Sequence, residues 1–298
     1  MRRTLLRLSA LLLLLACVPA WAAPPVPLLW KVSDHDSALY LLGSFHMLAR
    51  DDYPLAPEVE EAFAGAGTLV FELDPEEAAS PALAMRMVRA ARRTRPGSLR
   101  EDLGPELWAR LERQVAAGAL PAGWSEQFEP WFIALTLQLA GLARQGLDPE
   151  LGLDRHFMRA AAAAGKPASG LEPASAQIAL MAGMDLDEQR QMLAEVLDLL
   201  ESGPARLDRL HGMWRAGDAQ GLWEGIAVRM QRDYPALYAR INVARNDAWL
   251  PVLERHLAGR DDVLVVVGSL HLLGPDGLVE KLRARGYRVE RICRACAR

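Results

Sequence analysis

Short apolar runs of strand length lie near both ends of the chain. Leu28 to Val32 and Ala38 to Leu42 flank a polar turn, which predicts a hairpin. Thr68 to Leu73 does not alternate between apolar and polar positions, as expected of a strand covered on both faces. Val263 to Val267 is equally apolar, and Tyr287 to Ile292 predicts a last strand after a helix. The two ends of the chain therefore predict one sheet.

Between about residues 75 and 260 the apolar positions recur at helical spacing. One helix is predicted to start at Gly104-Pro105-Glu106, and the next is predicted to be capped by Ser125. Others are predicted at 154–164, 188–200, 218–231 and 236–258, with a brief strand at 167–171. The prediction is an α/β (α+β-like) fold with a large, mainly helical insertion in a sheet built from the N- and C-terminal parts of the chain.

Residues 1–22 have the pattern of a signal peptide. Three arginines precede an apolar stretch that is too short to span a bilayer, and Ala20-Trp21-Ala22 follows as a small-x-small cleavage site. Cleavage near Ala22 leaves residues 23–298, a length that suits a single domain. The chain is therefore predicted to be periplasmic or secreted.

The charge of the mature chain limits its partners. Removing the signal peptide removes three arginines and no acid, so the formal net charge falls from −4 to −7. An acidic chain is a poor ligand for nucleic acid. No later stretch is apolar for long enough to form a membrane helix, so the mature chain is expected to have no transmembrane segment.

The three cysteines raise two separate questions. Leu15-Ala16-Cys17 resembles a lipid-attachment box, which leaves a lipoprotein open as the alternative to soluble release. Cys293 and Cys296 could close a disulfide in an oxidising compartment. Because only two residues follow that pair, a staple of the tail is favoured over a redox motif.

The most informative feature is a short internal sequence repeat, Gly-Ser-x-His. It occurs at Gly43 to His46 and again at Gly268 to His271, each time after an apolar strand. Ligands of α/β sheets gather beyond the carboxyl ends of strands, where glycine permits close backbone approach. Gly43 and Gly268 are therefore predicted to contact a bound cofactor. The repeat predicts that both histidines point into one crevice, where imidazoles transfer protons or bind transition metals.

Two carboxylates are predicted at the same edge of the sheet. Glu72 lies near the end of the strand at 68–73, and Glu172 follows the small strand at 167–171. Burying either one unpaired would be costly, and a metal or a histidine partner would offset that cost. The alternative is a solvated acid at the end of a strand.

Other catalytic and metal-binding motifs are either absent from the sequence or better explained as structural features. The sequence contains no H-E-x-x-H, G-x-S-x-G or Walker-type pattern, so zincin, α/β-hydrolase and nucleotide-triphosphate functions lack support. Asp34-His35-Asp36 is rich in metal-ligand types, but its position between two strands favours a solvated hairpin turn.

The order and spacing of several short motifs resemble the TraB/GumN family, which includes the Tiki metalloproteases. The resemblance covers nearly the whole mature chain and rests on Gly43-Ser44-Phe45-His46, Val70-Phe71-Glu72-Leu73, Gly152-Leu153-Asp154, Gly170-Leu171-Glu172, Arg245-Asn246 and Gly268-Ser269-Leu270-His271. It implies a fold with both G-x-x-H turns at one site, shared distantly with erythromycin esterases and haem-binding ChaN-like proteins. His46, Glu72 and His271 would form the core of the site, with Arg245 and Asn246 as polar supports.

Three functions are compatible with these residues. The first is a hydrolase of a peptide or small acyl substrate, in which His46, His271 and Glu72 hold a divalent ion of the Mn, Co or Zn class, as the Tiki resemblance implies. The second is an esterase-like hydrolase that uses a His–Glu pair without a metal. The third is a non-enzymatic periplasmic protein that binds haem or another ligand or assists envelope polysaccharide.

Overall fold

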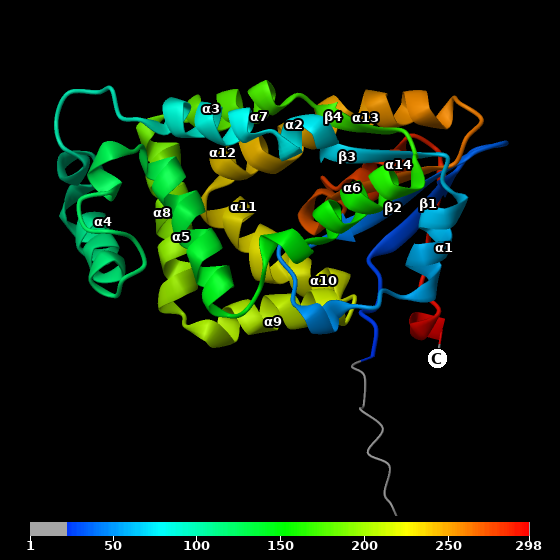
Figure 1. The fold of residues 1–298 in the computed structure, drawn as a ribbon, viewed down its shortest axis with the longest axis horizontal. Helices are drawn as coiled ribbons and strands as arrows, with labels where there is room; N and C mark the ends of the chain where they lie inside the picture. Colours follow the sequence, from blue (N-terminus) through cyan, green and yellow to red (C-terminus); the bar gives the residue numbers. More distant parts are fainter. Residues whose placement is uncertain (1–22, 298) are drawn as a thin grey trace, which may run out of the picture.

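The computed structural model describes residues 23–297, so the predicted signal peptide and Cys17 lie outside the described part. A six-stranded sheet has the order β4-β3-β5-β2-β1-β6, with helices packed around it and beyond one end (Figure 1). This architecture confirms the predicted α/β fold with its helical insertion. The strands are β1 (Leu29–Ser33), β2 (Ala38–Ser44), β3 (Thr68–Leu73), β4 (Ala168–Glu172), β5 (Val263–Gly268) and β6 (Arg288–Arg291).

The strand from the C-terminal part of the chain lies in the middle of the sheet. β5 pairs in parallel with β2 on one side and with β3 on the other, and β3 pairs in parallel with β4. β1 and β6 complete the sheet as antiparallel strands. Because β2, β5, β3 and β4 run in the same direction, their carboxyl ends share one edge. All six residues of β5 are buried, which explains its continuous apolar sequence.

The helices that contribute to the core around the sheet include α1 (Pro57–Gly65), α6 (Leu153–Ala164), α13 (Ala244–Leu257) and α14 (Leu278–Ala284). Apolar side chains at helical spacing, such as Phe157 and Ala161 of α6, are buried there. Removing these side chains from water stabilises the fold in proportion to their apolar area. The same helices place polar residues at the sheet edge.

A second apolar core lies in the helical part of the chain, away from the sheet (Figure 1). It is formed mainly by α4 (Leu99–Ala116), α5 (Pro130–Arg144) and α8 (Leu186–Glu201). The remaining helices are α2 (Pro75–Ala79), α3 (Pro81–Ala91), α7 (Ala174–Ala182), α9 (Pro204–Arg215), α10 (Ala219–Leu222), α11 (Arg229–Asp233) and α12 (Pro235–Tyr238).

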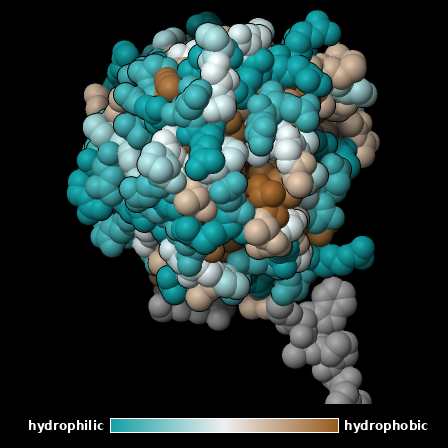
Figure 2. Space-filling view, turned by 90° about the vertical axis from the view of Figure 1, so that its left-hand side faces the viewer, coloured by the Kyte–Doolittle hydropathy of each residue, from teal (hydrophilic) through white to brown (hydrophobic). Residues whose placement is uncertain are grey.

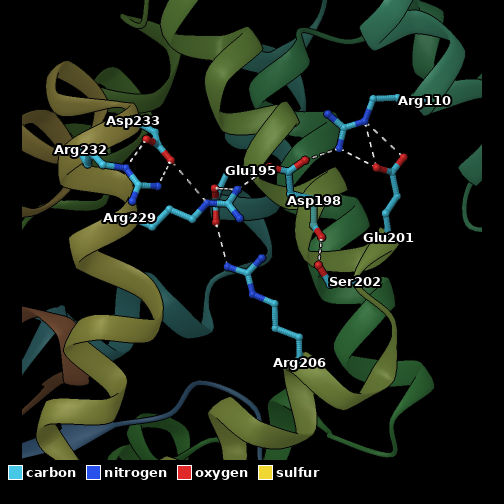
Figure 3. Close-up of polar contacts among 9 residues, drawn as sticks. All are labelled: Arg110, Glu195, Asp198, Glu201, Ser202, Arg206, Arg229, Arg232 and Asp233. Carbon is cyan, nitrogen blue, oxygen red and sulfur yellow. Dashed lines mark hydrogen bonds and ion pairs between the residues drawn. The ribbon is translucent and has the colours of Figure 1, made fainter.

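Charged side chains tie these helices together (Figure 3). Arg229 of α11 donates to Glu195 of α8 at 2.6 Å and also contacts Asp198 of the same helix. Arg110 of α4 binds Glu201 at 2.8 Å and reaches Asp198 as well. Because α11 leads into the wall of the cavity described below, this network fixes the wall relative to α8.

One predicted helix start is confirmed and one is wrong. Gly104 is non-helical (φ 74°) and divides α4, so a helical segment does start at Gly104-Pro105-Glu106, after a first segment that begins at Leu99 with a Ser98–Glu101 capping box. Ser125 does not cap the next helix, because it begins a 3-10 turn and α5 starts at Pro130. A lone serine such as Ser125 does not mark a helix start, whereas the reciprocal Ser98–Glu101 pair does.

The long helices predicted at 218–231 and 236–258 are both interrupted. π-Helical turns occur at Trp223–Val228 and Ala239–Val243. An inserted residue of this kind redirects side chains and is frequent at functional sites. Both turns contribute to the cavity at the sheet edge.

The surface and the tail agree with the sequence predictions. None of the helices in residues 23–297 has the length and apolar character needed to cross a membrane. The face on the side of α4 is largely hydrophilic, with apolar areas only in small patches (Figure 2). Cys293 and Cys296 form the disulfide that the tail permits.

Candidate active site

The two Gly-Ser-x-His turns lie side by side. Ser44 pairs with Gly268 in the β2–β5 register, and Oγ of Ser269 donates to the carbonyl of Ser44 at 2.8 Å. A Cβ on Gly43 would come within 3.0 Å of Oγ of Ser269, so the turns approach this closely only with glycine there. The repeated motif therefore brings two distant segments to one edge of the sheet.

His46 is held at one ring nitrogen and is accessible at the other. Nδ1 lies 3.0 Å from Oδ1 of Asp154, which also accepts a hydrogen bond from Oγ of Ser44 at 2.8 Å. The His46 side chain is 61% exposed and lines a cavity. A Cβ on Gly268 would lie 3.1 Å from Nε2 of His46 and 3.2 Å from Oε1 of Glu72. The imidazole and the carboxylate thus approach the same point.

The charge of His46 follows from its neighbours. Desolvation alone would lower the pKa of this histidine, but the carboxylates of Asp154 and Glu72 outweigh it and raise the pKa to about 9. Burial would raise the pKa of Asp154, yet the charge of His46 keeps it below its ordinary value. At neutral pH the pair is therefore imidazolium and carboxylate, and Nε2 carries a proton.

Glu72 is an ionised carboxylate with both oxygens in use. Oε1 accepts the backbone N–H of Gly268 at 2.8 Å, and Oε2 accepts Nη2 of Arg245 at 2.6 Å. Burial alone would raise the pKa of Glu72, but the cationic groups around it and the Gly268 N–H hold that pKa well below its usual range. Each oxygen keeps a second lone pair.

Arg245 of α13 connects the remaining residues. Nη2 and Nε donate to Oε1 of Glu172 at 2.7 and 3.0 Å, and Nη1 lies 3.0 Å from Nε2 of His271. The guanidinium stacks on Trp249, whose Nε1 donates to Oε2 of Glu172 at 3.1 Å. The planar fork of an arginine suits this arrangement of two carboxylates and a ring nitrogen.

His271 is neutral and its tautomer is set by its neighbours. Because Arg245 has only donors, Nε2 of His271 must accept. The proton then lies on Nδ1, which donates to Oδ1 of Asn246 at 2.7 Å, and Asn246 donates to the carbonyl of Asp276 at 2.8 Å. Burial lowers the pKa of His271 to about 4. This histidine holds Arg245 in place rather than carrying charge.

We expect the two histidines to give the stability of the protein opposite dependences on pH. The folded pKa of His46, about 9, exceeds its unfolded value of 6.5, so its contribution is lost as the pH rises from 6.5 to 9. The folded pKa of His271, about 4, is below 6.5, so stability falls as the pH drops from 6.5 to 4. Urea midpoints measured across pH 4 to 10 should show that His46→Gln removes the alkaline decline and keeps the acid one. An equally steep alkaline decline in the variant would contradict the His46–Asp154 pair.

The structure brings all the predicted catalytic residues together. Glu72, Glu172, Arg245 and His271 are linked through the contacts above, with Asn246 behind His271, and His46 lines the same cavity as Glu72, Arg245 and His271. Gly43 and Gly268 serve as positions of close approach. Whether they touch a cofactor stays a prediction.

Asp154 was missed as a site residue. It lies in the first turn of α6, whose start docks on the His46 turn through Leu153 N–H to the carbonyl of Phe45 at 3.2 Å. A Cβ on Gly152 would be 2.1 Å from the carbonyl oxygen of His46, so only glycine allows this contact. Asp154 belongs to one of the motifs quoted above, but nothing local marks it as a partner for a histidine.

The predicted metal ligands do not fit one ion in this arrangement. In residues 23–297, the group of His, Cys, Asp and Glu residues whose ligand atoms all lie within 4.8 Å of one another is Asp34, His35 and Asp36, in the β1–β2 turn. The ligand atoms of His46, Glu72 and His271 do not meet this distance criterion, and Arg245 donates to Nε2 of His271 and to Oε2 of Glu72. An ion shared by the three would have to displace a paired arginine.

The comparisons with known proteins show the family of the chain. The profile of the TraB/PrgY/gumN family matches residues 28–291, which include both histidine turns and every residue of the network. The chain belongs to the TraB/PrgY/gumN family. Relatives of this TraB/PrgY/gumN chain include the uncharacterized protein YbaP of Escherichia coli K12 and that of Shigella flexneri, each 27% identical over 245 residues, covering 82% of this chain and 87% of the relative. The comparison with solved structures gives no match.

Proposed function

We propose that this TraB/PrgY/gumN protein is an exported hydrolase of peptide or similar small acyl bonds, with His46 and Glu72 as its proton-transfer pair. The observation that carries the proposal is the approach of Nε2 of His46 and Oε1 of Glu72 to one point beside Gly268, in a cavity. A hydrogen-bond partner orients each group: Asp154 orients His46, and Arg245 orients Glu72. Such an oriented acid and base typically contribute 10²- to 10⁴-fold to a hydrolytic rate.

The charges assign a role to each group. Glu72 is ionised, so its carboxylate accepts a proton as water attacks the acyl carbon and a C–O bond forms. His46 is an imidazolium, so it gives its Nε2 proton to the nitrogen or oxygen that leaves as the acyl bond breaks. Transfer of the proton from Glu72 to His46 then restores the starting state. Water supplies every atom that the products gain.

Arg245 and its partners fix the charge and the position of Glu72, the base of this pair. The guanidinium holds Glu72 ionised and fixes the position of its Oε2. Glu172 and His271 orient Arg245, because they accept hydrogen bonds from its other N–H groups. These residues are positioning residues, and their pairing keeps several charges at the sheet edge without an isolated buried ion.

A divalent ion on His46, His271 and Glu72 is the alternative that the Tiki resemblance implies. The hydrogen bond from Arg245 to the one acceptor lone pair of His271 Nε2 favours the metal-independent form of the hydrolase. Among residues 23–297, no contact specifically supports a haem or ligand-binding role.

Chelation distinguishes the two forms of the hydrolase. Mature protein treated with EDTA and exchanged into metal-free buffer is expected to keep its full activity on a panel of peptides and aryl esters, and elemental analysis should give less than one bound transition metal per chain. Loss of activity that Mn²⁺, Co²⁺ or Zn²⁺ restores would establish the metal-dependent form. A Soret band without turnover would move the assignment to haem binding.

A further inference from the structure

Two cavities meet at the proposed catalytic pair. One has a volume of about 330 Å³ and the other of about 310 Å³. The linings share His46, Glu72 and Gln177. His46 and Glu72 therefore lie where the two cavities meet, rather than at the closed end of a single cavity.

The larger cavity, hereafter the helical cavity, has mainly apolar walls. Met181 of α7, Met192 of α8 and Met230 of α11 line it, together with Ile241 of the second π-helical turn. Its charged groups are confined to the end at the sheet edge. Flexible, polarisable methionines adapt to apolar groups of different shape, so this cavity suits an uncharged apolar side chain.

The smaller cavity, hereafter the strand cavity, is apolar on most of its lining as well. Leu73 of β3, Leu83 of α3 and Met158 of α6 form its walls beside Phe71. Gln177 of α7 is partly buried and lines both cavities, so its amide can reach a substrate in either one.

The charged groups of the two linings already have partners. Arg245 is paired with Glu72 and Glu172, and His46 with Asp154. Arg155 of the strand cavity lies 3.4 Å from Glu150. Within residues 23–297, neither lining offers an unpaired charge to receive the free amino or carboxyl end of a peptide.

We propose that the substrate is a chain that passes through both cavities and is cut at an internal bond flanked on each side by an uncharged apolar group. This inference rests on the proposed hydrolase function and adds the position of the bond and the chemistry of its neighbours. Apolar side chains on both sides bury their area in the two cavities. A single additional methylene in such a pocket changes kcat/KM by about 10- to 200-fold.

Blocked peptides test the position of the cut. The mature protein is incubated with acetylated, amidated hexapeptides that carry Leu-Leu, Ala-Ala, Asp-Leu or Leu-Asp at the centre between alanines, and products are identified by mass spectrometry. The expected result is cleavage between the two leucines, with kcat/KM lowered at least about tenfold by either aspartate. Failure to cut any of the four blocked peptides while the same Leu-Leu hexapeptide with free ends is cut, or equal cleavage of all four, would overturn the inference.

Paired variants test the two cavities separately. Met230→Asp introduces a charge into the helical cavity, and Leu83→Asp does so in the strand cavity. Each should lower kcat/KM for the Leu-Leu peptide at least about tenfold. The matched controls are Val228→Asp and Met85→Asp, close in sequence but 39% and 63% exposed, which should leave it unchanged. Because a buried aspartate can disturb folding, Met230→Phe is added, and it should slow the Leu-Leu peptide more than the Ala-Ala peptide.

A measurement of peptide binding distinguishes a failure of this inference from a failure of the proposed hydrolase function. If the Leu-Leu peptide raises the melting temperature of the protein and Met230→Asp abolishes that shift, but no peptide is cut, the hydrolase function fails and the two-cavity binding mode stands. If peptides are cut in a manner that depends on His46 while the charged variants behave like their controls, the hydrolase function stands and this inference fails.

Discussion

Replacing His46 by Gln is expected to lower kcat/KM for the hydrolysed bond by about 10²- to 10⁴-fold. Glutamine keeps much of the volume of the ring and can still hydrogen-bond to Asp154, but it has no proton of suitable acidity for the leaving group. The loss should appear in kcat, because the side chain acts on the reacting atoms rather than on substrate binding. Initial rates on the best substrate of the peptide and ester panel measure it.

The control for this variant is His35→Gln. His35 lies in the β1–β2 turn with its side chain 85% exposed, and its contacts are to Asp34 and Asp36. Its replacement should leave kcat/KM unchanged. If His46→Gln turns over substrate as fast as His35→Gln, the assignment of the site is wrong.

Arg245→Met should cause the largest loss of stability, about 3–5 kcal/mol in the free energy of unfolding. The change leaves the carboxylates of Glu72 and Glu172, 16% and 12% exposed, without their shared cation. It also leaves Nε2 of His271 without its donor. Urea unfolding at pH 7, followed by circular dichroism, gives the difference in the free energy of unfolding between the variant and the unaltered protein.

Two further variants decide whether charge causes that loss. Arg255→Met on the same helix removes an exposed arginine and should change stability by less than about 0.5 kcal/mol. Glu172→Gln combined with Arg245→Met should recover part of the loss, because one of the unpaired carboxylates is then neutral. A loss below about 1 kcal/mol for Arg245→Met would show that solvent already screens the carboxylates.

The predicted metal ligands show which part of the site the sequence gives. His46, Glu72 and His271 do reach one sheet edge, as their positions after strands predicted. The sequence does not show that Arg245, from a helix far along the chain, donates to two of them. Whether these side chains also bind a metal ion stays a prediction.

The sequence by itself determined the strands and the two histidine turns. Continuous apolar runs such as those of β3 and β5 follow from burial on both faces, and the Gly-Ser-x-His repeat marks their ends, because both signals are local. A helix interrupted by π-helical turns, as at Trp223–Val228, keeps nearly the same apolar spacing and was therefore predicted as continuous.

Only the tertiary structure decided which polar groups meet. The insertion of β5 between β2 and β3 places Gly268 beside Glu72, and the docking of α6 on the His46 turn supplies Asp154. These pairs are separated by about a hundred residues or more. Hydrogen bonds and ion pairs depend on distances of a few ångströms across the fold, and no periodicity along the chain encodes them.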